Sequence, residues 1–208
     1  MSVLGRNADP EVVRELLARI RDPHVAPINA LSDKIALAEG LEQGVVPYVD
    51  PDMGGIRARA LVLLDNPSTM AESGTGSGLL SLDNNDWTAR NCREAYAVYG
   101  VEWHDVVHWN VCPFPTSNIK NGRSKAGERH RAVRWTRELV ALLPRLEIVL
   151  PLGGSARDGW RRADQRPIGV YDFAGREIPH CGHRGLNRTP DSRRIFHEAI
   201  RDMAQLLG

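Results

Sequence analysis

Short apolar runs alternate with longer segments of helical periodicity along this chain. The runs over 59–65, 105–110 and 146–152 are bounded by turn-forming residues, a pattern typical of strands buried on both faces of a parallel sheet. Helices are predicted over 10–21, 28–38, 84–99, 124–143, 153–160 and 190–207, and a hairpin or bent strand over 168–178. Because strands alternate with helices, the pattern predicts an α/β fold with a central, mostly parallel sheet and right-handed crossovers.

Capping residues mark the ends of two predicted helices. Asp9 precedes Pro10, which indicates an N-cap followed by proline at the first helical position. Asp83 is predicted to cap the helix over 84–99, and Gly100 to end it. We interpret residues 1–57 as an N-terminal helical preface to a single domain that covers residues 1–208.

The composition is that of an ordinary globular domain. The chain has 208 residues, of which 42% are hydrophobic and 25% charged, enough for one sizeable core. No apolar run approaches the roughly 20 residues that span a bilayer, so we expect no membrane contact and a cytoplasmic location. Cys92, Cys112 and Cys181 are odd in number and widely spaced, which fits neither a disulfide framework nor a four-cysteine metal site. We predict reduced thiols and a monomeric protein.

Charge is unevenly distributed, although the whole chain carries a formal charge of only +1. Residues 1–104 hold 9 basic and 15 acidic side chains, a net charge of −6. Residues 105–208 hold 18 basic and 11 acidic side chains, a net charge of +7. This asymmetry is compatible with a polyanion-binding face in the second half, and equally with a solvated basic helix face.

Polar side chains follow each predicted strand. The segments are Asp65-Asn66-Pro67-Ser68, Asn110, Gly153-Gly154-Ser155, and Pro179-His180-Cys181-Gly182-His183-Arg184. In open parallel sheets, ligands bind outside the carboxyl ends of the strands, where these loops converge. Each segment taken alone could be an ordinary turn or cap. Together they would bring a carboxylate, two carboxamides and an imidazole into one crevice.

The segment Leu64-Asp65-Asn66-Pro67-Ser68 resembles a motif of one enzyme family. That family has G-Q-D-P-Y, G-I-N-P-G or G-E-A-P-G directly after a buried strand, and this segment is similar in its place and its proline. The next stretch, Ser77 to Asn85, resembles the family's segment between that motif and a helix. Leu79 stands where the family usually has an aromatic platform for the base.

Two later segments carry the same resemblance. The strand ending in Asn110 resembles the family's asparagine-bearing strand, and Pro179-His180 with the basic loop through Arg188 resembles its closing H-P-S-P motif. Over about residues 58–200 the chain is thus similar to the uracil-DNA glycosylase superfamily. The resemblance implies three α/β/α layers around a mostly parallel four-stranded sheet. It also implies no metal and no cofactor, since the four cysteines of the family's iron–sulfur branches are absent.

The activity implied by the resemblance is hydrolysis of the bond between a base and its deoxyribose, after the nucleotide is rotated out of the DNA. Asp65 or Asn66 would stabilise the sugar cation and orient water, and His180 would stabilise the anionic leaving base. Asn110 would read the edge of the base. Pro67, Ser68 and Leu79 would complete the base pocket.

The resemblance also implies contacts with DNA outside the pocket. His183, Arg184, Asn187 and Arg188 would press on the minor groove, with Arg184 as the candidate wedge. The turn that holds Gly153 and Ser155 would pack against the DNA backbone. Phosphate contacts are expected from Arg123, Lys125, Arg129 and Arg131.

Three alternatives stay open from the sequence. A protein of the same fold could bind damaged or modified DNA without catalysis. A metal-dependent hydrolase could use His180 and His183 with His104 or His108, although no ligand set of familiar spacing is present. A nucleotide-binding protein could hold a phosphate on the turn 153–155, but this turn lacks the residues of a P-loop.

Overall fold

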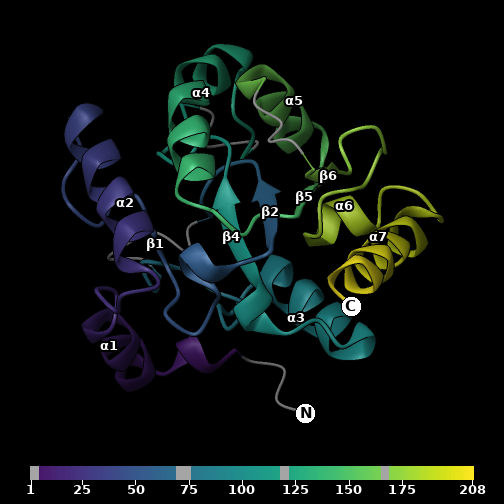
Figure 1. Cartoon of the computed structure of the whole chain (residues 1–208), viewed down its shortest axis with the longest axis horizontal. Helices are drawn as coiled ribbons and strands as arrows, with labels where there is room; N and C mark the ends of the chain where they lie inside the picture. The colour runs from purple at the N-terminus through teal and green to yellow at the C-terminus, as the bar shows by residue number, and fades with distance from the viewer. Residues whose placement is uncertain (1–4, 69–75, 118–121, 165–168) are drawn as a thin grey trace.

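A four-stranded parallel sheet with the order β4-β2-β5-β6 forms the centre of the computed structural model, which describes residues 5–68, 76–117, 122–164 and 169–208 (Figure 1). The strands are β2 (Ala60–Leu64), β4 (Val106–Asn110), β5 (Ile148–Pro151) and β6 (Tyr171–Asp172). Ala60 is in register with Val106 on one side and Ile148 on the other. The first three strands are almost entirely buried, and β2 and β5 are apolar throughout, so the predicted α/β fold with a parallel sheet is confirmed.

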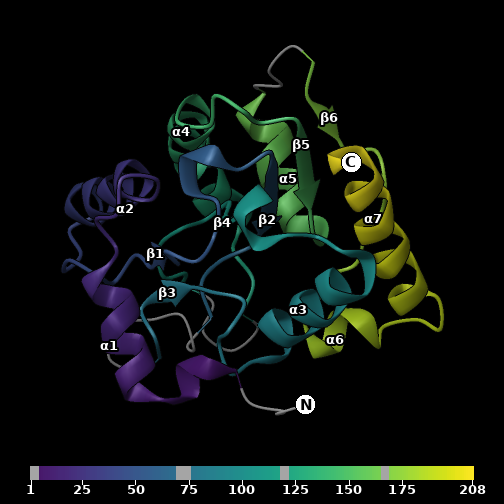
Figure 2. The same ribbon diagram turned by 60° about the horizontal axis from the view of Figure 1, so that its bottom comes forward.

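Helices cover both faces of this sheet, so the fold has three layers (Figure 2). They are α3 (Trp87–Tyr99), α4 (Ala126–Ala141), α5 (Gly154–Ala163) and α7 (Ser192–Leu207). In the strand order, the connection from β2 to β4 moves toward one side of the sheet, and the connections from β4 to β5 and from β5 to β6 move toward the other side. Right-handed crossovers therefore place α3 on one face and α4 and α5 on the other. Contacts agree, because α4 packs on α5 and α3 packs on α7.

The N-terminal part packs into the same core as the sheet. It contains η1 (Arg6–Ala8), α1 (Pro10–Ala18), α2 (Ala26–Ala38), β1 (Tyr48–Val49) and η2 (Gly55–Arg57). Strand β1 pairs in parallel with β3 (Leu79–Leu80) in a second, two-stranded sheet. Val25, Ile28 and Ile35 are fully buried in the main hydrophobic cluster. The preface is therefore a structural part of the domain and more than a helical extension.

The two predicted N-caps have different outcomes. Asp9 caps α1 by accepting a hydrogen bond from the Glu11 N–H at 2.9 Å, as predicted. The predicted cap at Asp83 is wrong, because α3 begins three residues later and is capped by Asp86. Asp83 instead accepts hydrogen bonds from Arg6 and Arg93. Asp83 thus takes part in ion pairs and not in a helix cap. Gly100 ends α3 in the left-handed region with φ of 70°, as predicted.

The described part of the predicted hairpin or bent strand, residues 169–178, does not form a hairpin. Strand β6 pairs in parallel with β5, and the chain then turns at Phe173, whose carbonyl accepts a hydrogen bond from the Arg176 N–H. The hairpin alternative is wrong because β6 finds its partner in a strand that precedes it by a whole helix. Beyond the turn, an extended segment leads to His180 and then to the short helix α6 (His183–Leu186).

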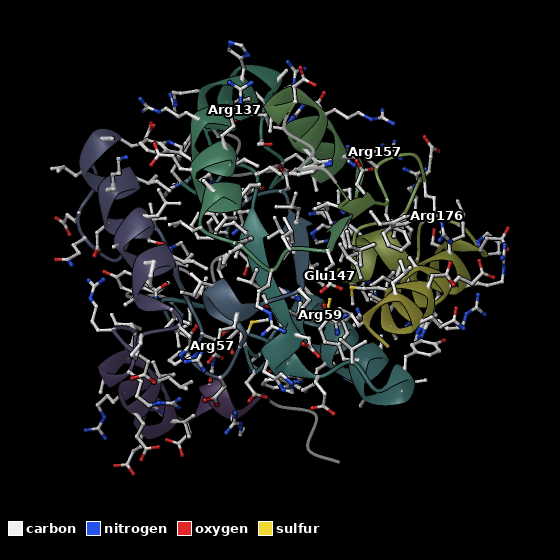
Figure 3. The ribbon with its side chains drawn as sticks, viewed as in Figure 1. Arg57, Arg59, Arg137, Glu147, Arg157 and Arg176 are labelled. Carbon is white, nitrogen blue, oxygen red and sulfur yellow. The ribbon has the colours of Figure 1, made fainter. Side chains whose placement is uncertain are left out.

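At the amino edge of the sheet, an ion pair joins the residues that directly precede β2 and β5. Arg59 donates from Nε to Glu147 Oε1 at 2.8 Å and from Nη2 to Oε2 at 2.7 Å, just before β2 and β5 (Figure 3). A third hydrogen bond from Arg59 reaches the carbonyl of Leu207 at the end of α7. Among the helices in the described ranges, none has the length and apolarity to cross a membrane.

Candidate functional site

Four predicted site residues lie at the carboxyl edge of the sheet. Asp65 and Asn66 directly follow β2, and Asn110 ends β4 opposite Leu64. Gly153 follows β5, and its N–H donates to the carbonyl of Ile178, two residues before His180. The parallel topology therefore brings residues from four segments to one edge.

The carboxylate of Asp65 is held in place by Ser124. The Ser124 hydroxyl donates to Oδ1, and the Ser124 backbone N–H donates to Oδ2 at 3.2 Å. Asp65 is 8% exposed. It therefore has a fixed orientation and a small opening to solvent at the end of β2.

Ser124 is itself fixed by a half-buried arginine. Arg129 donates to both the carbonyl and the hydroxyl of Ser124, and its Nε donates to Asp158 at 2.6 Å. These bonds join the segment that leads into α4 to helix α5 and to the end of β2. The network of Asp65, Ser124, Arg129 and Asp158 thus sets the position of the Asp65 carboxylate.

Asn66 is more open than Asp65. Its Nδ2 donates to the carbonyl of Pro67 at 3.2 Å, and its Oδ1 meets no donor among the described residues. Pro67 is buried and Ser68 is exposed, so the chain leaves the sheet at this point. The Asn66 carboxamide can accept a hydrogen bond from a water molecule or a ligand.

Asn110 is nearly buried, and its carboxamide can still take a ligand. The residue is 2% exposed, and its carboxamide makes no hydrogen bond to another described residue. The carboxamide atoms are not fully enclosed, because the fully buried side-chain atoms without a partner in the described ranges are Asn7 Oδ1, Asp50 Oδ2 and Trp109 Nε1. A ligand at the carboxyl end of β4 can therefore reach both its donor and its acceptor.

His180 is a half-buried, neutral hydrogen-bond donor. Its Nδ1 accepts a hydrogen bond from the Gly182 N–H at 2.9 Å, so the ring proton lies on Nε2. Burial lowers the pKa of His180, and the positive charge of Arg123 lowers it further. The negative charges of Asp65 and Asp86 oppose this lowering of the pKa.

Two glycines allow His180 to pack tightly. A Cβ on Gly153 would lie 3.1 Å from the Cβ of His180, and Gly153 has φ of 93°. A Cβ on Gly185 would lie 2.0 Å from the His180 carbonyl oxygen. Gly153 is therefore needed for close approach of the turn before α5 to His180, which differs from the predicted contact with a DNA backbone.

The predicted DNA-contacting residues fall into exposed and half-buried groups. His183, Arg184, Asn187 and Arg188 lie on or just after α6 and are exposed. Ser155, in the first turn of α5, is half-buried. The α6 segment therefore forms a basic surface beside His180.

Leu79 lies away from this edge. It is fully buried in β3 and packs with Leu16 of α1 and Tyr48 of β1 in a separate hydrophobic cluster. This position corrects the prediction that Leu79 lines a base pocket, because its side chain has no surface for a ligand. The likeness of the surrounding segment did not show that β1 would bury it.

One of the expected phosphate contacts is also corrected, because the Arg129 guanidinium is engaged by Ser124 and Asp158 and its side chain is 13% exposed. Arg131 pairs with Glu39 at 3.1 Å and lies over the Phe114 ring at 4.6 Å. Its side chain is still 55% exposed, so its phosphate contact stays a prediction. Arg123 and Lys125 are exposed and lie beside the site.

The histidines proposed as metal ligands do not meet. His108 is buried within β4, where its Nε2 is 2.8 Å from the Tyr96 hydroxyl, and burial lowers its pKa to about 4. His104 precedes β4 and lies at the opposite edge of the sheet from His180. No cluster of three or more histidine, cysteine or acidic residues in the described ranges could hold a metal ion.

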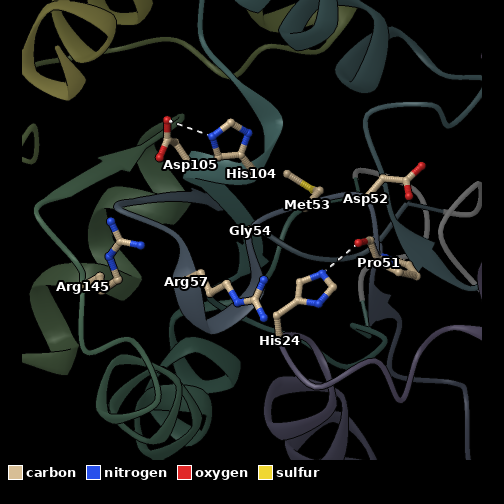
Figure 4. A pocket seen from close by; sticks show the side chains of 9 residues that line it. All are labelled: His24, Pro51, Asp52, Met53, Gly54, Arg57, His104, Asp105 and Arg145. Atoms are coloured by element: carbon tan, nitrogen blue, oxygen red, sulfur yellow. Dashed lines mark hydrogen bonds and ion pairs between the residues drawn. The ribbon is translucent and has the colours of Figure 1, made fainter.

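A pocket of about 330 Å³ lies at that opposite, amino edge (Figure 4). Its lining consists of His24, Pro51, Asp52, Met53, Gly54, Arg57, His104, Asp105 and Arg145. Asp52 is neutralised by Arg6 and Arg19, and the His24 Nε2 donates to the Pro51 carbonyl. The predicted site residues therefore lie at the other end of the strands from this pocket.

Ser124 is the site residue that the sequence analysis missed. It stands in a polar segment far from Asp65 along the chain, as the first residue of the helix predicted over 124–143, and no local pattern connects it with Asp65.

Comparison with known proteins adds nothing to the geometry. No family model and no curated protein matches this chain.

Proposed function

We propose that the protein is a DNA glycosylase that hydrolyses the N-glycosidic bond of uracil or another altered base after base flipping, in base-excision repair. The observation that carries the proposal is Asn110, whose nearly buried carboxamide makes no hydrogen bond to another described residue, at the same sheet edge as Asp65 and His180. Such a group favours recognition of a planar ligand with both a donor and an acceptor.

The reaction requires stabilisation of two opposite charges. The sugar becomes cationic while the departing base becomes anionic. Asp65 provides a fixed negative charge, and the Asn66 Oδ1, which accepts no hydrogen bond from a described residue, provides an acceptor for the attacking water. Asn66 is the more accessible of the two, so we assign water binding to Asn66 and charge stabilisation to Asp65.

His180 would act on the base. Its neutral ring has a donor at Nε2, because Nδ1 accepts from Gly182. A hydrogen bond from Nε2 to a base carbonyl becomes stronger as negative charge develops on that oxygen. This role needs no proton transfer from His180, which agrees with its lowered pKa.

A second candidate function has support from Ser124. Both oxygens of Asp65 accept hydrogen bonds from that residue, which is also what a purely structural carboxylate would show. A protein with this site could bind damaged or modified DNA without cleaving it. The two functions predict the same binding and differ only in product formation.

The test uses fluorescent oligonucleotides that carry one uracil, hypoxanthine, xanthine or modified cytosine, in single- and double-stranded form. Alkali after incubation cleaves any abasic site. We expect a product band with one of the bases, and its loss in the Asp65→Ala/Asn66→Ala double variant. Asp105→Asn is the matched control, because this carboxylate lies at the amino edge of β4 and should leave the product unchanged.

The single variants Asp65→Asn and Asn66→Ala then separate charge from water binding. DNA binding without product on any of these bases would contradict excision and favour the binding protein. Absence of both binding and product would contradict both functions.

A further inference from the structure

Trp87 is the most exposed tryptophan of the chain. It leaves 52% of its surface open, whereas Trp109, Trp135 and Trp160 are between 0% and 4% exposed, and Trp103 is half-buried. Tryptophan combines a large apolar ring with one polar group, and it is enriched where proteins bind partners. Its exposure at the start of α3 therefore points to a function in binding.

Two side chains fix the Trp87 ring. The His183 ring of α6 lies 5.2 Å away between centroids, at an angle of 54°. The Arg90 guanidinium lies 5.3 Å from the Trp87 ring centroid, and Arg90 is held by Glu94 at 2.8 Å. Trp87 is thus a supported ring surface, and little conformational freedom would be lost on binding.

The ring is close to the carboxyl-edge site. Asn91, one turn further along α3, donates to the Cys181 carbonyl at 2.7 Å, directly after His180. Asp86, directly before Trp87, contributes to the electrostatic environment of His180. The start of α3 and the His180 segment therefore form one continuous surface.

The positive charges near Trp87 indicate which class of partner it binds. Arg184 and Arg188 are exposed near His183, and neither forms an ion pair within the described ranges. An exposed aromatic ring next to unpaired arginines is complementary to a nucleic-acid strand, because the ring can stack on a base while the arginines contact phosphates. A neutral apolar peptide would leave these charges without partners.

We propose that Trp87, supported by His183, stacks on an unpaired nucleobase of bound DNA beside the carboxyl-edge site. This inference deepens the proposed function and rests on its DNA substrate, but not on excision. It adds an aromatic contact that the sequence analysis did not assign, on a different element from the predicted wedge at Arg184.

The test compares two ligands with equal charge. One is a short oligomer of thymidine, and the other has the same number of phosphates on abasic sugars. Binding is measured by fluorescence anisotropy in 50 mM salt for the full chain and its Trp87→Ala and Trp87→Phe variants. We expect Trp87→Ala to weaken thymidine-oligomer binding roughly 10-fold and abasic-oligomer binding hardly at all. Trp87→Phe, which keeps a ring, should stay within about 3-fold.

The matched control is Tyr171→Ala, since Tyr171 is also an exposed aromatic residue, at 47%, with a ring neighbour in Phe173. Tryptophan emission gives a second readout: the thymidine oligomer should quench wild-type emission, and this quenching should be lost in Trp87→Phe. Thermal melting confirms that each variant is folded.

Each outcome has a separate meaning. Equal weakening for both oligomers, or no weakening for either, would overturn the stacking role. Binding with the expected Trp87 dependence but without excision would support stacking and contradict the glycosylase activity. Failure of the wild type to bind the thymidine oligomer would overturn stacking, and uracil-containing duplexes would then test the proposed function by themselves.

Discussion

Ser124 donates two hydrogen bonds to the Asp65 carboxylate, although the two residues are 59 positions apart in the chain. Ser124 belongs to the segment that leads into α4, and Asp65 follows β2. The orientation of the carboxylate therefore depends on a residue that would not contact substrate itself.

Ser124→Ala should weaken both stability and activity. Loss of the hydroxyl leaves a buried carboxylate with one hydrogen bond fewer, which costs about 1–3 kcal/mol of unfolding free energy. Under the proposed function, single-turnover excision should fall about 10-fold, because Asp65 is less well oriented. Urea denaturation and single-turnover kinetics measure the two effects. Ser117→Ala, at an exposed serine in the same connection, is the control, and equal behaviour of both variants would contradict a positioning role.

Asn110 and Asn29 are both buried, and they should respond differently to substitution by alanine. The Asn29 carboxamide makes hydrogen bonds with the Ile20 carbonyl at 2.9 Å and with the Val49 N–H at 2.7 Å, whereas the Asn110 carboxamide makes none to a described residue. Asn29→Ala should lower the unfolding free energy by about 2–4 kcal/mol. Asn110→Ala should change it by less than about 1 kcal/mol and should reduce excision at least about 100-fold.

Chemical denaturation and excision assays on the same preparations check this contrast. Strong destabilisation by Asn110→Ala would mean that its carboxamide has a structural role. Unchanged excision would remove Asn110 from the site.

His108 should make stability depend on pH. Burial lowers its pKa from 6.5 to about 4, so the unfolded chain binds a proton more readily than the folded one. The resulting stabilisation, about 3 kcal/mol, is complete above pH 6.5 and is lost as the pH falls toward 4. His108→Gln can keep a hydrogen bond to Tyr96 and should flatten this part of the curve of unfolding free energy against pH.

The control for this measurement is His130→Gln, at an exposed histidine of α4. The informative quantity is the difference between wild type and variant at each pH, because carboxylates titrate in the same range. A difference that does not change between pH 7 and pH 4.5 would show that His108 is not the responsible group.

Leu79→Ala should affect stability without affecting the site. Leu79 is fully buried between α1 and β1, and truncation of a buried leucine costs about 2–5 kcal/mol. Excision per folded molecule should stay at the wild-type level well below the melting temperature. The control is Leu206→Ala, at a leucine that is 45% exposed, which should change neither stability nor excision. Loss of excision in a fully folded Leu79→Ala protein would contradict this correction and show that Leu79 contributes to the site.

The sequence was sufficient for the elements whose pattern is local. Strands β2 and β5 are continuous apolar runs, β4 begins with two valines, and Asp9-Pro10 is a local capping signal, so their positions followed from neighbouring residues alone. Strands β1 and β3 are only two residues long and exist because they pair with each other across the chain. No local pattern could have predicted them.

The candidate site shows the same division. The topology of a parallel sheet places Asp65, Asn110 and His180 at one edge once the strands are known. The environment of each group depends on distant partners, such as Ser124 for Asp65 and the Gly153 turn for His180. Asp83 and Asp86 illustrate the limit, because both are suitable caps, and the sequence did not show that Asp86 caps α3 while Asp83 pairs with Arg6 of the N-terminal part.

The strand order β4-β2-β5-β6 has a consequence for biosynthesis. The two inner strands are β2 and β5, so the central pairing of the sheet forms only when β5, which is late in the chain, docks onto the early strand β2. A nascent chain released as far as residue 150 holds Asp65 and Asn110 but neither Gly153 nor His180. Until the ribosome has delivered the C-terminal part, the early strand has one of its two edges unpaired. This interval is when the growing polypeptide is most exposed to aggregation and to chaperone capture.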